Sequence, residues 1–503
     1  MTSNKKDILA VILFSILFTF LFHQKALGLN LLIAEVVFIS WLVFSKQFQF
    51  KGLYPISVGI GFIITSLATV FTHSLFSYIL HFIVFFIFIG LIIYPQTKSL
   101  LNSVGQAFSN IFESQGQFCR KLTSSRIKGR KLSTYTRKAS IFIIPILIIL
   151  FFVYIYRNSN PVFDGLVNDT WNFIGDKLNS IFATFDFLLI MTFIICLFIS
   201  IFLLIRIPNE GLIKLDKNAN ENLQRKRRIE LKFFRPNGLI NEYKSGVFLL
   251  LILNLMILIL NFIDIKWVWF NFEWEGQYLK QFVHEGTYLL IFSIIISIVL
   301  VLYYFRKNLN FYKNNKLLKY LSYIWLIQNG ILTISVAVRN FWYINYFALA
   351  YKRIGVIIFL ILCLYGLYTV FMKVKHRKSR FYLFKINFNA FVLVLVISSL
   401  FNWDSIIAKY NFRNSDTSFL HLNYMSTLSD KSLPYLDKTL LELEQIEIIQ
   451  NEKFPFGRDY MASERYFNVI EMRKENFRDK WESKGLLSWN YPEYKAYQKL
   501  FKD

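Results

Sequence analysis

The chain has 503 residues, of which 55% are hydrophobic and 55 are phenylalanine, and its mean hydropathy is +0.42. A soluble domain averages roughly 45–50% apolar residues even when glycine is counted, so this composition argues against a soluble globular enzyme. The net charge of +25 would suggest nucleic acid in a soluble protein, but in a membrane protein it is typical of basic cytoplasmic loops. The cysteines and histidines show no spacing of a disulfide framework or a metal site, so neither a metal nor another cofactor is expected.

Apolar runs predict an all-α polytopic transmembrane bundle of about eleven spans. Crossing a bilayer takes roughly 17–25 apolar residues, and continuous runs in lipid form helices because the backbone must satisfy its own hydrogen bonds. The uncharged stretch 53–96 is too long for one helix and is divided at Thr72-His73-Ser74. The first run could instead be a signal peptide, but no good cleavage site follows, which favours an uncleaved span. The predicted spans are Ile8–Phe22, Leu29–Phe44, Pro55–Thr72, Leu75–Tyr94, Ser140–Tyr156, Phe187–Ile205, Gly246–Ile263, Thr287–Phe305, Tyr320–Val338, Ile354–Met372 and Ile386–Leu400.

The basic segments predict the orientation of these spans. Cytoplasmic loops are enriched in Lys and Arg, and alternation of eleven spans puts the strongly basic segments on one side. The segments are 95–139, 206–244, 306–319 and 373–385. The N-terminus is therefore expected in the cytoplasm and the C-terminus outside, in the inner or plasma membrane of a bacterium. Residues 339–353 are also basic but fall outside in this scheme, so one miscounted span would move them to the cytoplasmic side.

The last fifth of the chain differs from the rest. Residues 401–503 hold 15 basic and 16 acidic residues and no apolar run long enough to span a membrane. Residues 1–400 hold 42 basic and 16 acidic residues. We expect a small soluble helical tail. The predicted organisation is four N-terminal spans in 1–94, a basic cytoplasmic loop in 95–139, a seven-helix core in 140–400 and the outer tail in 401–503.

Several motifs resemble an uncharacterised family of bacterial polytopic membrane proteins, a domain of unknown function of the 4153/4173 type. The similarity covers roughly residues 140–435 and implies a topology without an activity or catalytic residues. The motifs are Tyr156-Arg157-Asn158-Ser159-Asn160-Pro161-Val162-Phe163, His284-Glu285-Gly286-Thr287, Ile327-Gln328-Asn329-Gly330 through Arg339, Tyr343, Tyr346 and Tyr351-Lys352-Arg353, and Asn402-Trp403-Asp404 through Tyr410-Asn411 and Leu428-Ser429-Asp430-Lys431.

Glu35 is the acid that lies deepest inside an apolar span. An ionisable group there costs about 2.5–3.5 kcal/mol on insertion scales and is by default a candidate functional site. It could bind a proton, a cation or a ligand. The alternative is a hydrogen bond to a neighbouring helix that only stabilises packing.

Arg339, Lys352 and Arg353 flank an aromatic segment on the predicted outer side. Cations beside aromatic rings at a membrane interface could hold an anionic headgroup or a phosphate. In the alternative, the rings form an interfacial belt and Arg339 pairs with an outer acid, for which Glu273, Glu275 and Glu285 are candidates.

Two further groups are weaker candidates. His284 and Glu285 at the mouth of the eighth span could do acid–base chemistry, although adjacent helical residues point about 100° apart. Asn329 in the ninth span, with Gln328 and Thr333, could line a polar cavity shared with Arg339 or simply hydrogen-bond helices together. No catalytic residue and no metal ligand is assigned.

The remaining expectations concern partners and function. The basic loops are expected to attract anionic lipid headgroups, nucleic acid is not expected as a partner, and no nucleotide-binding motif is present. The favoured function is binding or moving a small or lipid-like ligand in the bacterial envelope. The alternatives are a sensor or assembly partner acting through the outer tail, with an envelope protein as its partner, and an enzyme acting on lipid or glycan, which is the least favoured.

Overall fold

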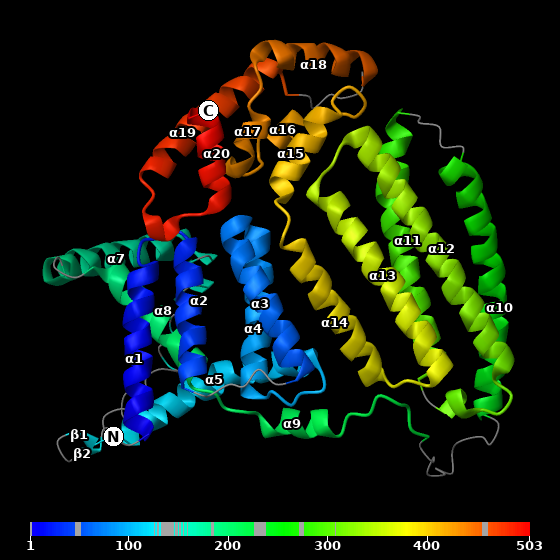
Figure 1. The fold of residues 1–503 in the computed structure, drawn as a ribbon, viewed down its shortest axis with the longest axis horizontal. Coiled ribbons are helices and arrows are strands. Elements are labelled where there is room, and N and C mark those ends of the chain that lie inside the picture. The colour runs from blue at the N-terminus through cyan, green and yellow to red at the C-terminus, as the bar shows by residue number, and fades with distance from the viewer. Residues whose placement is uncertain are drawn as a thin grey trace.

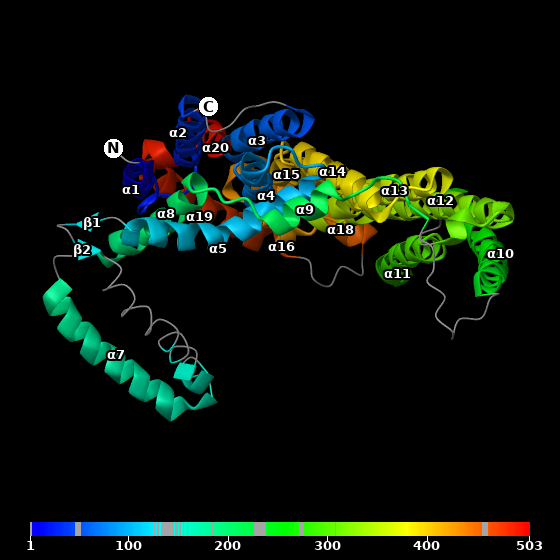
Figure 2. The same cartoon turned by 90° about the horizontal axis from the view of Figure 1, so that it is seen from below.

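The computed structural model describes residues 3–45, 52–124, 160–182, 186–225, 238–270, 276–306, 308–454 and 461–502, with short pieces between 126 and 159. The chain is an all-α bundle, as the sequence predicts. The β structure in these residues is a two-residue antiparallel pair, β1 (Arg126–Ile127) with β2 (Arg130–Lys131), and an isolated bridge between Asn222 and Lys378. Seen from below, the helices form a long flat layer from which α7 (Pro161–Phe182) projects (Figure 2).

Five helices form one end of this layer, which we call the N-terminal helix group (Figure 1). They are α1 (Ser3–Phe22), α2 (Leu29–Phe44), α3 (Leu53–Phe71), α4 (Leu75–Ile93) and α8 (Phe187–Leu204). The predicted division at Thr72-His73-Ser74 is confirmed. His73 turns the chain with a φ of 42°, and Ser74 caps α4 by accepting a hydrogen bond from Ser77 N. Phe residues of these helices, among them Phe38, Phe62 and Phe88, form a shared core.

At one end of the N-terminal helix group, two helices run across the spans (Figure 1). They are α5 (Leu100–Ser124) and α9 (Glu210–Lys217). The sequence analysis predicted residues 95–139 as a loop and missed α5. Its buried face is polar as well as apolar: Asn110 Nδ2 donates to Phe202 O of α8 at 3.0 Å. A Cβ on Gly90 would lie 1.8 Å from Ser103 O, so α4 and α5 pack backbone to backbone here.

The C-terminal helix group forms the other end of the layer. It consists of α10 (Gly238–Asp264), which continues through the π-helical turn η1 (Ile265–Phe270), α11 (Gly276–Tyr304), the short η2 (Asn308–Phe311), α12 (Lys316–Phe347) and α13 (Tyr351–His376). Its core is separate from that of the first group. Helix α14 (Arg380–Ser398) joins the two, because Leu383 packs in this core while Val392 and Val396 pack in the other.

Eight helices of the described residues are long and apolar enough to cross a membrane, against the eleven spans predicted. They are α3, α4, α8, α10 with η1, the Gly286–Tyr304 part of α11, α12, α13 and α14. Helix α2 is apolar but has only 16 residues, and α1, which carries Lys5, Lys6 and Asp7, is not one of the eight. The predicted span Ser140–Tyr156 lies mostly outside the described residues. The count of eleven therefore stays a prediction.

The tail is helical, as expected, and covers the end of the bundle opposite α5 and the start of α1 (Figure 1). It has its own core, which also takes in Ile354 of α13. Its helices are α15 (Trp403–Arg413), α16 (Leu422–Met425), η3 (Asp430–Ser432), α17 (Leu433–Leu436), α18 (Leu440–Lys453), α19 (Ser463–Glu482), η4 (Leu486–Ser488) and α20 (Tyr491–Phe501).

Candidate functional site

Glu35 is buried at the centre of the N-terminal helix group. It lies on α2 and is only 5% exposed. One carboxyl oxygen, Oε2, accepts a hydrogen bond from Ser66 Oγ of α3, and the other, Oε1, lies 2.5 Å from His81 Nε2 of α4. The carboxyl group thus joins three helices, and these contacts offset part of the cost of placing it there. His81 was not a predicted site residue.

His81 also contacts α3 on the other side of its ring. His81 Nδ1 lies 3.1 Å from Thr65 Oγ1, and Thr65 Oγ1 lies 3.1 Å from Phe62 O. A hydroxyl has one hydrogen, so if Thr65 donates to the Phe62 carbonyl, the hydrogen of the Nδ1–Oγ1 contact belongs to Nδ1. The ring thus connects Glu35 of α2 to Thr65 of α3.

Beside Glu35 lies an apolar cavity of about 290 Å³. Four helices line it, α1, α2, α4 and α8, and Glu35 is the only charged group among the described residues on its walls. The other lining residues are Phe18, Phe22, Leu27, Leu31, Ala34, Phe38, Phe82, Phe85, Thr192, Ile195, Cys196, Ile199 and Leu203. An apolar pocket with one convergent polar group has the composition of a small-molecule site.

The structure separates Arg339 from the other two cations of the predicted clamp. Arg339 Nη2 donates to Asp264 Oδ1 of α10 at 2.5 Å, and both side chains are buried. The sequence analysis considered Glu273, Glu275 and Glu285 as partners. Of these, residues 273 and 275 lie outside the described residues, as does the side chain of 285. The partner within the described residues is Asp264, the last residue of α10, which extends one residue past the predicted span.

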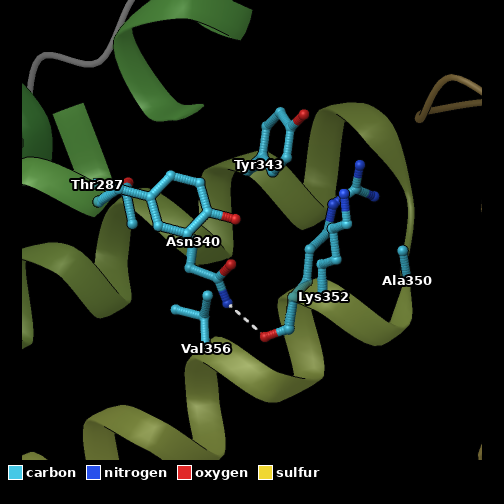
Figure 3. A pocket seen from close by; sticks show the side chains of 8 residues that line it. Thr287, Asn340, Tyr343, Ala350, Lys352 and Val356 are labelled. Carbon is cyan, nitrogen blue, oxygen red and sulfur yellow. Dashed lines mark hydrogen bonds between the residues drawn. The ribbon is translucent and has the colours of Figure 1, made fainter. Parts of the chain in front are cut away.

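Lys352 and Arg353 lie in the first turn of α13 and line a small cavity of about 90 Å³ between α11, α12 and α13 (Figure 3). The Arg353 guanidinium stacks 4.3 Å from the centre of the Tyr343 ring and donates to the carbonyls of Phe347 and Ala348 at the end of α12. Asn340 Nδ2 donates to Arg353 O at 3.2 Å. Arg353 therefore fixes the α12–α13 turn, whereas Lys352 is exposed.

Asn329 and its neighbours lie in the seam between α10 and α12. Gln328 Nε2 donates to Asn254 Oδ1 at 2.9 Å, and Asn261 Nδ2 donates to Gln328 O at 3.0 Å. Asn329 Nδ2 bonds within its own helix, to Trp325 O at 2.7 Å. Gln328 thus connects helices, which is the packing role that the sequence analysis weighed for this group.

His284 and Glu285 lie in the helical part of α11, but their side chains are outside the described residues. The hypothesis of acid–base chemistry at this pair therefore stays a prediction.

Residues that carried the family resemblance meet where the tail contacts the spans, a cluster that was not a predicted site. Asp404 accepts hydrogen bonds from Tyr351 OH at 2.8 Å and Ser429 Oγ at 2.6 Å. Lys431 Nζ lies 3.2 Å from Asp404 Oδ2 and donates to Thr72 O of the α3–α4 turn at 2.9 Å. Burial lowers the pKa of Lys431, and the Asp404 carboxylate acts in the opposite direction.

Two more contacts hold the tail. Asn411 bonds both backbone groups of Leu349 in the α12–α13 turn, at 2.7 and 2.9 Å. Glu493 of α20 lies 3.5 Å from His73 Nε2 and also pairs with Lys484. Burial alone would raise the pKa of the Glu493 carboxyl, but hydrogen bonds from His73 and Lys484 outweigh it and hold that pKa at about 2.

A family model described as domain of unknown function (DUF4153) matches residues 8–439, which confirms the resemblance and extends it over the first four predicted spans. No curated protein and no solved structure matches the chain.

Proposed function

The chain belongs to this family of unknown function, and we propose that it is a membrane protein that binds a lipid-like ligand in the cavity beside Glu35. One observation carries the proposal: a cavity with apolar walls from four helices has a buried carboxyl group among its lining residues. A carboxyl group that only stabilises helix packing does not need a cavity beside it. A site for a ligand with a polar head needs both the cavity and a polar group in its wall.

The walls and the carboxyl define the class of ligand. The volume of about 290 Å³ is at the small end of the roughly 300–1,000 Å³ of ligand pockets, so it suits a short alkyl chain or the end of a longer one. Glu35 offers acceptor oxygens, which favours an amine or hydroxyl head over a carboxylate. His81 holds the Oε1 side of this carboxyl in place through its contact with Glu35.

Photolabelling tests this proposal. The full-length protein in lipid nanodiscs is exposed to a diazirine-bearing alkylamine and to the fatty acid of the same length, and the labelled residues are located by mass spectrometry. The amine should label residues of α1, α2, α4 and α8. A hydrogen bond to a charged group contributes about 1.5–3 kcal/mol, so Glu35→Gln should weaken amine labelling by about tenfold or more.

A pair of variants on α2 provides the control. Ala34→Phe adds bulk inside the cavity. Val36→Phe places the same ring at a neighbouring position, where the native side chain is 54% exposed. We expect the first to abolish labelling and the second to leave it unchanged. Labelling of the four helices that persists in Ala34→Phe would overturn the proposal.

A second candidate function is docking of an envelope partner on the tail. Leu441 and Ile448 lie seven residues apart on α18 and are 64% and 68% exposed, on an element that contacts the rest of the tail through its other face. Replacing both by glutamine should leave the unfolding temperature unchanged and remove any partner that crosslinks to α18 in cells.

The proposed topology keeps the N-terminus in the cytoplasm and the tail outside. Supporting this, the start of α1 and the tail lie at opposite ends of the spans, and the basic segments around α5 and α9 lie at the end where α1 starts (Figure 1). Anionic headgroups of the inner leaflet are the proposed partners of these segments. Labelling single cysteines at Asn345 and at the exposed Ser483 of the tail, but not at Thr123, with an impermeant thiol reagent in intact cells is the expected result.

A further inference from the structure

The small cavity at the start of α13 is independent of the Glu35 cavity, since it lies in the C-terminal helix group. It is lined by Thr287 and Tyr288 from α11, by Asn340 and Tyr343 from α12, and by Ala350, Lys352, Arg353 and Val356 at and after the α12–α13 turn (Figure 3). Asn340 lies across the open space from Lys352. At about 90 Å³ it has room for a single small group.

The electrostatics of this cavity favour an anion. Helix α13 has 26 residues and starts beside the cavity, and the N-terminus of a helix carries about half a positive charge. Its N-cap, Ala350, offers no side-chain cap, although Tyr351 N donates to the Tyr424 hydroxyl at 3.3 Å, and its first turn contains Lys352 and Arg353 but no acid. Cations are unfavourable at this end of a helix unless an anion is present.

Lys352 is the charge available to such an anion. Arg353 already donates to the Phe347 and Ala348 carbonyls, and the nearby Asp404 pairs with Lys431. Within the part of the chain that the structure describes, Lys352 makes no hydrogen bond or ion pair.

Thr287 gives an independent indication of a ligand. Its side chain is 5% exposed and lines the cavity, and its hydroxyl has no hydrogen-bond partner among the described residues. A buried hydroxyl without a partner costs roughly 1–3 kcal/mol, and a bound water or ion is one way in which native proteins satisfy it. The hydroxyl of Thr287 beside the cavity can supply such a hydrogen bond to the oxygen of an anion.

We propose that this cavity binds a phosphate group, which takes its charge from Lys352 and the α13 N-terminus and a hydrogen bond from Thr287. Both a phospholipid headgroup and free phosphate present this chemistry. The outer surface of α11 next to the cavity exposes Leu289 and Phe292, so a lipid tail has an apolar surface to lie along.

The test measures thermal unfolding of the full-length protein in nanodiscs. One set contains phosphatidylcholine alone, a second contains added phosphatidylglycerol, and the first is also titrated with inorganic phosphate. Native mass spectrometry counts the anionic lipids retained. The variants are Lys352→Gln, Thr287→Val and the control Lys409→Gln, which removes the same charge from an exposed position on α15.

Phosphatidylglycerol should stabilise the parent protein and Lys409→Gln equally. Lys352→Gln and Thr287→Val should each lose about tenfold in affinity for the retained lipid, as expected for one hydrogen bond to a charged group. The same response to inorganic phosphate alone identifies a soluble anion as the ligand. If neither anion gives a stabilisation that the two cavity variants lose, the proposal is wrong.

Discussion

Replacing Lys431 by methionine should release the tail from the membrane helices. Its ammonium group donates to Thr72 O at 2.9 Å and to His73 O at 3.2 Å and lies 3.2 Å from Asp404 Oδ2. Removing one partner of a buried ion pair costs roughly 3–5 kcal/mol, because the other charge is left uncompensated. Asp404 keeps its hydrogen bonds from Tyr351 and Ser429. We therefore expect the docked tail to lose stability near the lower end of this range, about 3 kcal/mol.

Limited proteolysis of the full-length protein in detergent reports this loss. Cleavage through a transiently opened tail follows the population of the open form, and about 3 kcal/mol raises that population by roughly 100-fold. The matched control is Lys409→Met, at an exposed lysine of α15. The double variant Lys431→Met/Asp404→Asn should lose less than the sum of the single variants, because it leaves no buried charge alone. A cleavage rate of Lys431→Met equal to that of Lys409→Met would refute the reasoning.

Three other predictions concern packing, a second ion pair and pH. Gly90→Ala places a Cβ 1.8 Å from a backbone oxygen of α5 and should lower the unfolding temperature sharply, while Gly330→Ala, which meets open space, should stabilise by up to about 1 kcal/mol. Arg339→Gln should lower the free energy of unfolding by roughly 3–5 kcal/mol, and the double variant Arg339→Gln/Asp264→Asn should lower it clearly less. Thermal unfolding that shows equal losses for the single and the double variant would contradict this. Glu493 has a folded pKa of about 2 against about 4.3 unfolded, so its contribution is present above pH 5 and lost as the pH falls toward 2. Hydrogen exchange in α20 should then rise, and unchanged exchange would exclude this role.

The helices could be predicted from the sequence where apolar residues continue without interruption over the length of a membrane span. Five predicted spans end within one residue of the helix ends at Phe22, Phe44, Phe71, Ile93 and Leu204, and three lie inside the longer helices α10, α12 and α13. Two more pass the ends of α11 and α14 by one and two residues. Helix α5 was missed because serine, glutamine and asparagine interrupt its apolar residues, which recur at helical spacing instead of continuously.

The candidate sites were predictable only in part. Glu35 could be found because a carboxyl inside an apolar run is costly wherever its partners are. Its partner His81 is 46 residues away and becomes visible only once α2, α3 and α4 pack together. Arg339 was likewise found without its partner, because the helix that carries Asp264 extends beyond the apolar run that predicted it.

The contacts of the tail also bear on the order in which the protein is completed during synthesis. The turns that precede α2 and α4 are held by the last part of the chain: Leu29 N donates to Trp489 O at 3.0 Å, and Thr72 O accepts from Lys431. A ribosome makes the first four helices more than 300 residues before it makes these partners. The nascent N-terminal helices therefore enter the bilayer with one end unsecured, and a premature stop before Trp489 would destabilise these helices as well as remove part of the tail.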